Sequence, residues 1–412
     1  MSADGDRGTA GRDWAVIGLI GSAHACSHFY QLVLPPLFPF LKAEFGVSYT
    51  ELGLLMSLFY GVSGCLQAPA GFVVDRIGAS KVLIGGILLA AGAVTLFGLV
   101  PGYWMLLPLV ALAGVGNSVF HPSDYTILSA SVSERRLGRA YGVHTIGGNL
   151  GWAAATAFML ALTGLVGWRI ALVAAGGVGL ALAAALVAQR HRFRDHRRPA
   201  GHTRPPLPGM GLRQSATVLL NRPVLLCLAY FTLLSTAMTG VQTFLPSTLL
   251  GLRGTPVDVA SAALTGFLLG ASGGVVVGAA LADRRVRPDL VVCVGLALAG
   301  CLILLVSAVA LGPTMLVAVL AAAGFQLGLT TPSRDMMVRA AAPAGATGRV
   351  FGFVYSGLDI GGAVAPLVIG VLLDHHGARE SLWATVALLT LAIGTILAMR
   401  RDRPAPVLRP AE

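Results

Sequence analysis

Charged residues are scarce in this sequence: Asp, Glu, Lys and Arg together make up 11% of the 412 residues, whereas apolar types make up 55%. A soluble domain carries roughly a quarter charged residues, so water is not the main solvent of this chain. Aromatic residues are also few, at 7%, while glycine is abundant, with 53 residues. Small residues let neighbouring helices approach closely in lipid. The composition therefore predicts a helical protein embedded in a lipid bilayer.

Motifs that carry enzyme chemistry are also absent. We find no zinc-ligand spacing, no nucleotide-binding P-loop and no Gly-x-Ser-x-Gly elbow. His121-Pro122-Ser123-Asp124 contains a serine, a histidine and an acid, but consecutive residues on a helix cannot form a relay triad. His375 and His376, beside Asp374, could hold a metal, although a solvated loop explains them as well. We therefore expect no enzyme, no cofactor and no metal.

The cysteines and the N-terminus add two further exclusions. The five cysteines all lie in apolar stretches, which indicates unpaired core residues and not a disulfide or metal framework; they are Cys26, Cys65, Cys227, Cys293 and Cys301. The first thirteen residues are polar and lack the pattern of a cleaved signal. We therefore expect the first apolar run to be a helix of the mature protein.

Twelve apolar runs are each long enough to cross a bilayer, which takes about 20 residues. They lie near residues 14–41, 50–74, 81–100, 103–131, 138–163, 165–188, 223–250, 259–282, 289–311, 313–338, 348–373 and 381–399. The basic, proline-containing interval 189–222 separates the first six from the last six and is typical of a solvated linker. The sequence predicts an all-α membrane protein with two six-helix bundles, residues 1–188 and 223–412.

Basic residues indicate how the chain crosses the membrane. With both termini inside, 25 of the 29 Lys and Arg residues lie inside, and only Lys42, Arg169, Arg253 and Arg379 lie outside. Cytoplasmic loops carry an excess of Lys and Arg. We therefore predict a multi-pass protein with both termini in the cytoplasm. The net charge of +11 is then a topology signal, and we expect no nucleic-acid partner.

The two halves of the chain repeat one another. In the first half the repeated residues are Gly114, Pro122, Ser123, Gly138, Arg139, Gly142, Gly147 and Gly151, and 210 residues later they recur as Gly324, Pro332, Ser333, Gly348, Arg349, Gly352, Gly357 and Gly361. Leu34-Pro35 recurs as Leu245-Pro246, 211 residues later. Internal repeats of this kind are typical of transporters, whose substrate site lies near the bilayer midplane between the repeats.

A loop with a distinctive spacing lies between the second and third predicted helices. It reads Gly71-Phe-Val-Val-Asp75-Arg76-Ile-Gly78-Ala-Ser-Lys81, and a degenerate copy, Ala282-Asp283-Arg284-Arg285, occupies the matching place in the second half. This pattern resembles the signature loop of the major facilitator superfamily. The resemblance extends over nearly the whole chain and implies a secondary carrier in which residues 1–190 rock against residues 220–412. We expect the carrier to be a monomer in the lipid bilayer.

Two further segments resemble one branch of that superfamily. They read Leu34-Pro35-Pro36-Leu37-Phe38-Pro39-Phe40-Leu41-Lys42 and Val119-Phe120-His121-Pro122, and they are similar to the bacterial fosmidomycin-resistance branch. This resemblance implies proton-driven export of a small phosphonate antibiotic across the bacterial inner membrane. The predicted fifth helix departs from many antiporters, because Gly147-Gly148-Asn149-Leu150-Gly151 contains no proline. Drug export and the direction of transport therefore stay open.

Polar residues of the first and seventh predicted helices form a repeated stripe. His24, His28 and Gln31 share one helix face because they are spaced by four and three residues. Their counterparts one repeat later are Ser235, Thr239 and Gln242. Polar groups inside a bilayer are costly and usually face the bundle interior or a wet cavity. The stripe predicts contact with substrate or protons, although each histidine alone could be a packing residue.

The fourth and tenth helices place opposite charges at equivalent positions. Asn117, His121, Asp124 and Tyr125 cluster on one side of the fourth helix, and Arg334 is the counterpart of Asp124. Asp124 and Arg334 could belong to a gate that rearranges as the halves move. They could equally form separate local ion pairs, for example that of Arg334 with Asp335.

The fifth and eleventh helices add further candidates. Thr145 and Asn149 correspond to Tyr355 and Asp359, and each pair is four residues apart on one face. Asp359 is an acid in an otherwise apolar segment, which makes it a candidate proton site. Asn149 and Asp359 could instead form hydrogen bonds between helices.

These residues together predict a function. Arg334 and the histidines favour a small anionic or zwitterionic organic substrate, moved by alternating access and coupled to protons. The first helix has no acid before Glu44, so proton coupling would need the histidines, Asp124 or Asp359. The alternatives are a proton-driven exporter of cationic or amphipathic drugs and a membrane sensor that transports nothing.

Overall fold

Long helices make up the described part of the chain, which is residues 3–194, 219–282, 286–341 and 347–401 of a computed structural model. The N-terminal half contains α1 (Ala3–Gln31), η1 (Pro35–Leu37), α2 (Phe38–Phe45), α3 (Tyr49–Ile77), α4 (Ala79–Phe97), η2 (Tyr103–Met105), α5 (Leu106–Ser118), α6 (Phe120–Ser131), α7 (Glu134–Val166), α8 (Trp168–Ala188) and η3 (Arg190–Arg192). The C-terminal half contains α10 (Arg222–Arg253), α11 (Val257–Ala282), α12 (Pro288–Ala308), α13 (Pro313–Ala341), α14 (Thr347–His375) and α15 (Ala378–Arg401).

The helices confirm the predicted all-α membrane fold. By length and composition, 11 helical segments within the described residues can cross a membrane, with α5 and α6 counted together as one span. The first helix, α1, is a further long helix that begins with polar residues. Its predicted extent of 14–41 is wrong, because α1 ends at Gln31 and Pro35 and Pro36 begin a separate short turn. Proline lacks a backbone donor and its ring clashes inside a helix.

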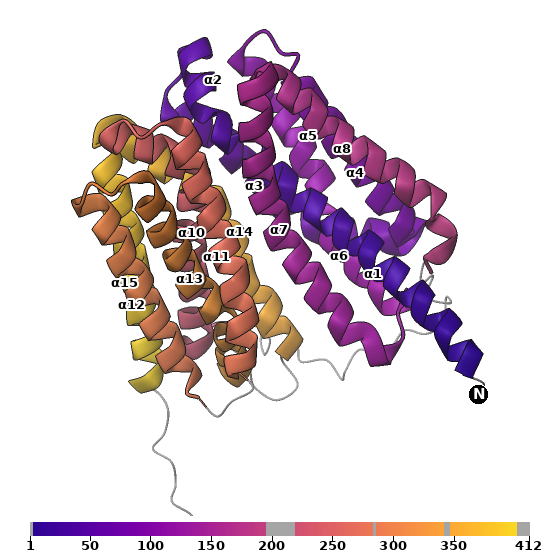
Figure 1. Ribbon diagram of the computed structural model, residues 1–412. Coiled ribbons are helices and arrows are strands. Elements are labelled where there is room, and N and C mark those ends of the chain that lie inside the picture. The colour runs from indigo at the N-terminus through magenta and orange to yellow at the C-terminus, as the bar shows by residue number, and fades with distance from the viewer. Residues whose placement is uncertain (1–2, 195–218, 283–285, 342–346, 402–412) are drawn as a thin grey trace, which may run out of the picture.

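Both halves use the same set of helix pairings. In the N-terminal half α1 packs on α7, α3 on α5, and α4 on α8. In the C-terminal half the equivalent pairs are α10 with α14, α11 with α13, and α12 with α15. Figure 1 shows the N-terminal half in indigo to magenta and the C-terminal half in orange to yellow, as two bundles that lie side by side. The sequence repeat is therefore matched by a repeat in packing.

The halves touch mainly through α3 with α14 and α7 with α11. Gly53 of α3 lies so close to the carbonyl oxygen of Pro366 that a methyl group added there would clash with it. Further along the same pair, Gly64 lies beside Asp359 of α14. Near the start of α3, Asp374 of α14 accepts hydrogen bonds from the backbone N–H groups of Tyr49 and Thr50. We call this end, where α3 begins, the closed end.

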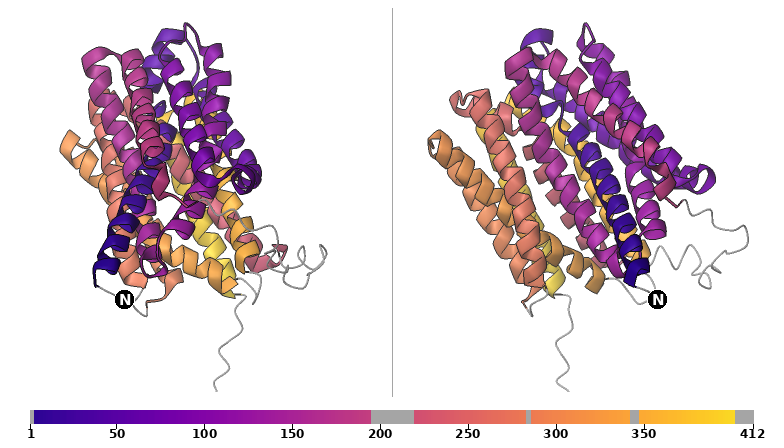
Figure 2. Two further views of the ribbon diagram at one scale, coloured as in Figure 1. Left: turned by 90° about the vertical axis from the view of Figure 1, so that its right-hand side faces the viewer. Right: turned by 45° about the vertical axis from the view of Figure 1, so that its right-hand side comes forward.

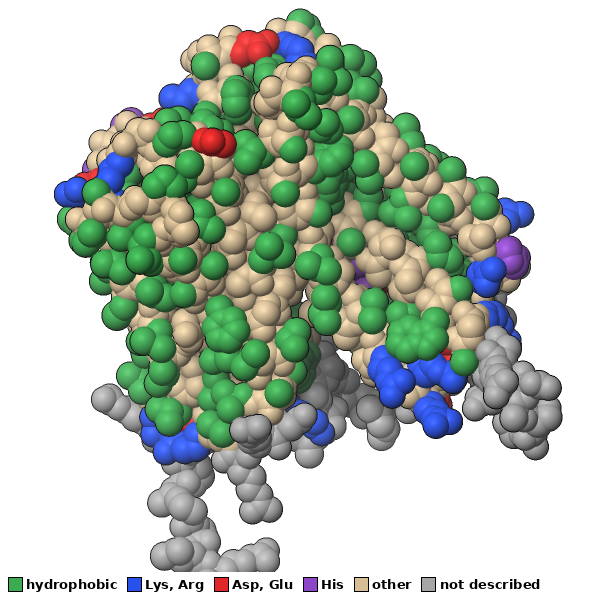
Figure 3. All heavy atoms as spheres, in the orientation of Figure 1, with side chains coloured by type: hydrophobic (Ala, Val, Ile, Leu, Met, Phe, Trp, Pro, Cys, Tyr) green, Lys and Arg blue, Asp and Glu red, His purple; other side chains and the backbone are tan. Residues whose placement is uncertain are grey.

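At the opposite end the two bundles diverge. Figures 1 and 2 show the gap between them widening toward the end where the N-terminus lies, which we call the open end. The space-filling view in Figure 3 shows a hollow between the halves at this end, with a histidine side chain visible inside it. We call this hollow the cleft.

The signature loop lies at the open end of α3. Asp75 and Arg76 are exposed in the last turn of α3, and Gly78 ends the helix with a φ of 96°, a backbone conformation that favours glycine. A methyl group at Gly71 would meet no neighbouring atom, so close packing does not explain that glycine. Asp283 and Arg284 lie outside the described residues, as does most of the predicted linker 189–222.

Candidate functional site

Four imidazole rings gather in the N-terminal half around one carboxylate. His24 of α1 lies at the centre, with its ring centroid 3.5 Å from that of His144, 4.4 Å from that of His28 and 5.2 Å from that of His121. Asp124 of α6 lies beneath them and is fully buried. We call these five residues the histidine cluster.

Asp124 is held by two of the histidines. Its Oδ2 lies 3.1 Å from Nε2 of His144 and 3.4 Å from Nδ1 of His24, whereas its Oδ1 has no hydrogen-bond partner among the described residues. A buried charge is costly unless it is paired and hydrogen-bonded. The two imidazole contacts offset part of that cost.

The other two histidines are half-buried and sit above the buried pair. Nδ1 of His121 lies 3.2 Å from Oε1 of Gln67 on α3. The His28 ring lies 4.3 Å from the ring of Trp152, whose Nε1 donates a hydrogen bond to Oε1 of Gln31 at 2.9 Å. Gln31 therefore belongs to the surroundings of the cluster, as the shared helix face predicts.

Tyr125 completes the exposed side of the cluster. Its side chain is 44% exposed, and its ring centroid lies 5.1 Å from that of His144 and 6.3 Å from that of His121. It follows Asp124 directly on α6, so the buried carboxylate and the exposed phenol are adjacent in the chain.

Glycines on α7 make room for the cluster. A methyl group added at Gly148 would come within 2.8 Å of the His28 ring and 2.9 Å of Nε2 of His24. At Gly147 and Gly151 an added methyl group would clash with the backbone of α1. The proline-free Gly147–Gly151 stretch thus lets α1 approach α7 closely and leaves space for two imidazoles.

The predicted candidates of the C-terminal half lie apart from the cluster. The Arg334 guanidinium lies 5.0 Å from the centroid of the Phe231 ring, and its Nε is 3.2 Å from Oδ1 of Asp335. Tyr355 also packs on Phe231, with ring centroids 5.0 Å apart. Arg334 and Asp124 therefore each have local partners in this conformation and do not pair with one another.

Three more candidates have separate positions. Asp359 is exposed on α14 next to Gly64, at the boundary between the halves. Asn149 is half-buried on α7, one residue after Gly148, and Gln242 is buried on α10. Neither Asn149 nor Gln242 takes part in a hydrogen bond that joins it to the cluster within the described residues.

Sequence reasoning missed three residues of the site. His144 is not among the candidates that the sequence predicts, although it makes the shorter contact with Asp124. Trp152 and Gln67 were also not selected as ligands. The signal for His144 and Trp152 lies in their spacing of four residues on either side of Gly148, which puts all three on one face of α7.

The fold and the cluster define a class: a multi-pass membrane transporter, with two repeated helical halves around a polar cleft. The family model described as Major Facilitator Superfamily matches residues 20–312 and 249–412. The chain therefore belongs to the major facilitator superfamily. Membership of this family makes it a secondary transporter of small solutes and not an enzyme.

Relatives with assigned names match parts of the chain. The fosmidomycin resistance protein of Escherichia coli strain K12 is 24% identical over 276 residues, which are 66% of each chain. The D-galactonate transporter of Escherichia coli O6:H1 is 26% identical over 141 residues, 34% of this chain and 33% of that protein. The chain thus matches just under two thirds of the length of the first and about a third of the second.

A solved structure matches nearly the whole fold. It is a bacterial homologue of the human lysosomal transporter Spinster in an inward-facing, unoccupied conformation. The TM-score is 0.78, the sequence identity is 16%, and the match covers 96% of this chain and 99% of that one. At this identity the likeness shows the shared fold alone.

Proposed function

We propose that the chain couples the movement of a small anionic or zwitterionic organic solute to the movement of protons. The observation that carries the proposal is the histidine cluster, in which the fully buried Asp124 contacts two imidazoles within a membrane-spanning bundle. Ionisable groups inside a membrane are rare and mark ion or substrate pathways. Histidine is the side chain whose charge changes most readily near neutral pH.

A path for protons leads from the cleft to the buried carboxylate. His28 and His121 are half-buried, whereas His24, Asp124 and His144 are buried. A proton that enters from the cleft therefore meets the two outer rings before the inner group. The inner carboxylate is that of Asp124, whose Oδ2 lies 3.1 Å from Nε2 of His144.

Positive charge in the cleft supports an anionic substrate. Protonation of the cluster adds positive charge on the N-terminal side, and Arg334 contributes a fixed charge on the other half. An anion that binds more tightly to the protonated state must in turn strengthen proton binding, because the two effects are reciprocal. D-galactonate, named for one relative, is an anion of this class.

Alternating access follows from the contacts between the halves. The closed end is joined by α3 with α14, whereas the cleft separates the halves at the open end. Rocking would break the first set of contacts and bring the open ends together. We propose that the open end, where the N-terminus lies, faces the cytoplasm of a bacterial inner membrane, because the excess of basic residues predicts that side.

The test is proton movement in proteoliposomes that contain the purified full-length protein and a pH-sensitive dye. A panel of small carboxylates, phosphonates and cationic drugs should yield a substrate-dependent pH change for anions only. Asp124→Asn should abolish the pH change. The matched control is Asp13→Asn, because Asp13 is also a buried acid of the N-terminal half but pairs with Arg136 away from the cluster.

The results separate the parts of the proposal. Asp124→Asn with unchanged uptake kinetics and pH dependence would contradict the proton role of the cluster. Arg334→Gln should reduce transport of anions selectively, whereas an equal loss for all substrates would indicate structural damage. Saturable exchange of a labelled compound without any pH change would indicate an exchanger or a uniporter.

A proton-driven exporter of cationic or amphipathic drugs is the second candidate. The observation that favours it is Asp359, an exposed acid at the boundary between the halves that has no ion pair with a described side chain. A permanent cation would be stabilised by an acid in that position. A pH change with cationic drugs that Asp359→Asn removes, and no change with anions, would favour this candidate.

A further inference from the structure

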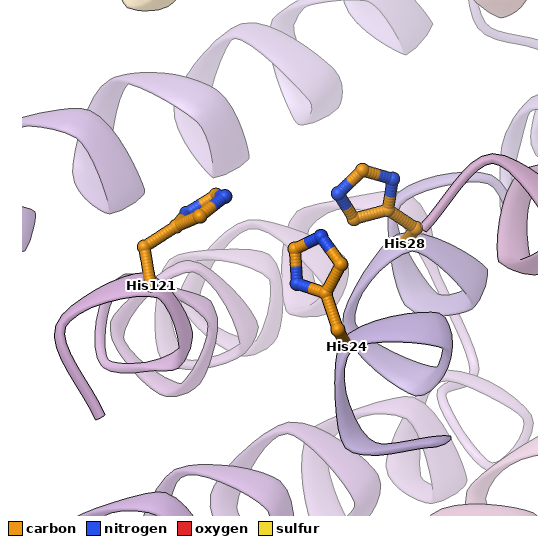
Figure 4. Close-up of side chains that lie close together, drawn as sticks. All are labelled: His24, His28 and His121. Carbon is orange, nitrogen blue, oxygen red and sulfur yellow. The ribbon is translucent and has the colours of Figure 1, made fainter. Parts of the chain in front are cut away.

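Three histidines of the cluster point a ring nitrogen toward one common space. His24 and His28 come from α1 and His121 from α6, and each offers a nitrogen that lies within 4.8 Å of the other two. Figure 4 shows these nitrogens facing the space between the three rings. Neutral imidazole nitrogen is a common ligand of transition-metal ions in proteins.

In His24 and His121 the other ring nitrogen, Nδ1, faces a polar side chain and not the common space. Nδ1 of His24 lies 3.4 Å from Oδ2 of Asp124, and Nδ1 of His121 lies 3.2 Å from Oε1 of Gln67. Histidines that ligate a metal almost always donate the other ring N–H to a carboxylate, a carbonyl or water, which orients the ring and raises its basicity. These contacts leave Nε2 of both rings for the common space.

His28 also directs its Nδ1 away from the common space. Its Nδ1 has no hydrogen-bond partner among the described residues and lies against Gly148, where an added methyl group would come within 2.9 Å of it. Of the three rings, His121 therefore has the supporting hydrogen bond typical of a metal ligand, and His24 has a carboxylate 3.4 Å from its Nδ1.

We propose that His24, His28 and His121 bind a divalent transition-metal ion that prefers imidazole ligands, with Zn²⁺ as the representative. Three protein ligands leave a coordination position open, as in catalytic and not in structural zinc sites. The inference goes beyond the proposed function and does not rest on it, because metal binding is measurable without transport. No sequence spacing reveals this site, since its ligands come from two helices that are far apart in the chain.

A second group of possible ligands, His24, Asp124 and His144, is the weaker choice. All three residues are buried, and Asp124 already contacts His144 at 3.1 Å. His28 and His121, by contrast, are only half-buried. In this proposal Asp124 and His144 support the His24 ring, and His24, His28 and His121 bind the ion.

The experiment uses the full-length protein, purified in detergent without a polyhistidine tag. Zn²⁺ is titrated in competition with a chromogenic chelator, and the Co²⁺ absorption spectrum provides a second measurement. We expect a single ion per chain, and at least about tenfold weaker binding in His28→Gln and in His121→Gln. Asp124→Asn should weaken binding by about 10- to 100-fold, the usual effect of losing a group that orients a ligand.

The matched control is a variant with His375→Gln and His376→Gln, since these adjacent exposed histidines lie at the closed end and outside the cluster. Its affinity for Zn²⁺ should equal that of the unaltered protein. Unchanged affinity in both cluster variants, or loss of binding in the control variant, would overturn the proposal. Zn²⁺ should also raise the unfolding temperature of the unaltered protein, and no rise at saturating Zn²⁺ would overturn it without any variant.

Discussion

Replacement of Asp374 by asparagine should weaken the contact that holds the closed end together. One carboxylate oxygen accepts a hydrogen bond from the Tyr49 N–H (2.9 Å), and the other accepts hydrogen bonds from the N–H and hydroxyl of Thr50 (both 2.7 Å). The ammonium of Lys42 lies 4.0 Å away. The acceptor belongs to the C-terminal half and every donor to the N-terminal half. An asparagine side chain keeps one acceptor oxygen, loses the charge, and presents an NH₂ group that cannot accept from N–H donors.

The size of the effect follows from the number and exposure of these bonds. Hydrogen bonds to charged groups contribute about 1.5–3 kcal/mol each when sheltered, but those of Asp374 are exposed to solvent. We therefore expect a total loss of about 1–3 kcal/mol, which corresponds to a change of about 5- to 150-fold in the ratio of closed to open states at this end.

The start of α3 should survive the substitution. Ser48 caps the helix by accepting the N–H of Glu51, and the Glu51 carboxylate accepts the N–H of Ser48 in return. This capping box lies wholly within the N-terminal half. Ser48→Ala is therefore the matched control, because it weakens the helix start and leaves the contact between the halves in place.

The assay is a distance measurement between two spin labels at the closed end. Trp104 and Val309 are exposed residues that belong to opposite halves, and cysteines introduced there can carry the labels once the five native cysteines are replaced. Asp374→Asn should add a population with a longer distance, and Ser48→Ala should not. An unchanged distance distribution in a folded Asp374→Asn protein would refute the reasoning.

Three further predictions concern packing, a polar node and pH. Gly53→Ala should also open the closed end, because the new methyl group meets the Pro366 carbonyl oxygen, and the same label pair measures it. Asn117→Ala should lower the free energy of unfolding by about 0.6–1.7 kcal/mol, since its amide joins serine hydroxyls of α1 and α3; denaturant unfolding checks this. Hydrogen bonding to Arg169 lowers the pKa of Glu44 below 4.5. The contribution of Glu44 to stability is therefore present above pH 4.5 and is lost as the pH falls through the lowered pKa. Because Glu44 is 41% exposed, Glu44→Gln should cost under about 1 kcal/mol at pH 7. The cost should shrink as the pH falls through the lowered pKa of Glu44, as thermal unfolding over a series of acidic pH values would show.

The sequence predicted the helical fold because its signals are local. Apolar runs of about 20 residues directly indicate membrane-spanning helices, and the recurrence of Pro122 as Pro332 indicates that the chain has two related halves. The predicted first helix extends too far because hydropathy does not show where a helix ends within an apolar run. Pro35 and Pro36 carried that information, since proline disfavours a helix interior.

The site was predicted only in part because its contacts join distant segments. Helix spacing put His24 and His28 on one face, but no spacing could show that His121, Asp124 and His144 meet them. The pairing of Arg334 was also left open by the sequence, because Asp335 beside it and Asp124 one repeat away were both possible partners. Only the packing of the helices decides between such partners.

The repeat places side chains at equivalent positions and gives them different chemistry. Where the N-terminal half has His24, His28, His121 and Asp124, the C-terminal half has Ser235, Thr239, Thr331 and Arg334. The first set consists of three imidazoles and a carboxylate, whereas the second consists of hydroxyls and a guanidinium. The histidine cluster therefore belongs to the N-terminal half alone among the described residues. If proton binding there drives rocking, as we propose, its effect must reach the other half through helices that touch both the cluster and the opposite bundle.

The helix α7 meets both conditions. It carries His144 and Trp152 at the cluster, lines the cluster with Gly148, and packs against α11 of the C-terminal half. The helix α3 reaches the cluster through Gln67 and packs against α14. Because α7 is one continuous helix from Glu134 to Val166, a shift of its cluster face moves its contact with α11 as well. For the proposed coupling of proton binding to rocking, α7 is therefore the helix that joins the cluster to the C-terminal half.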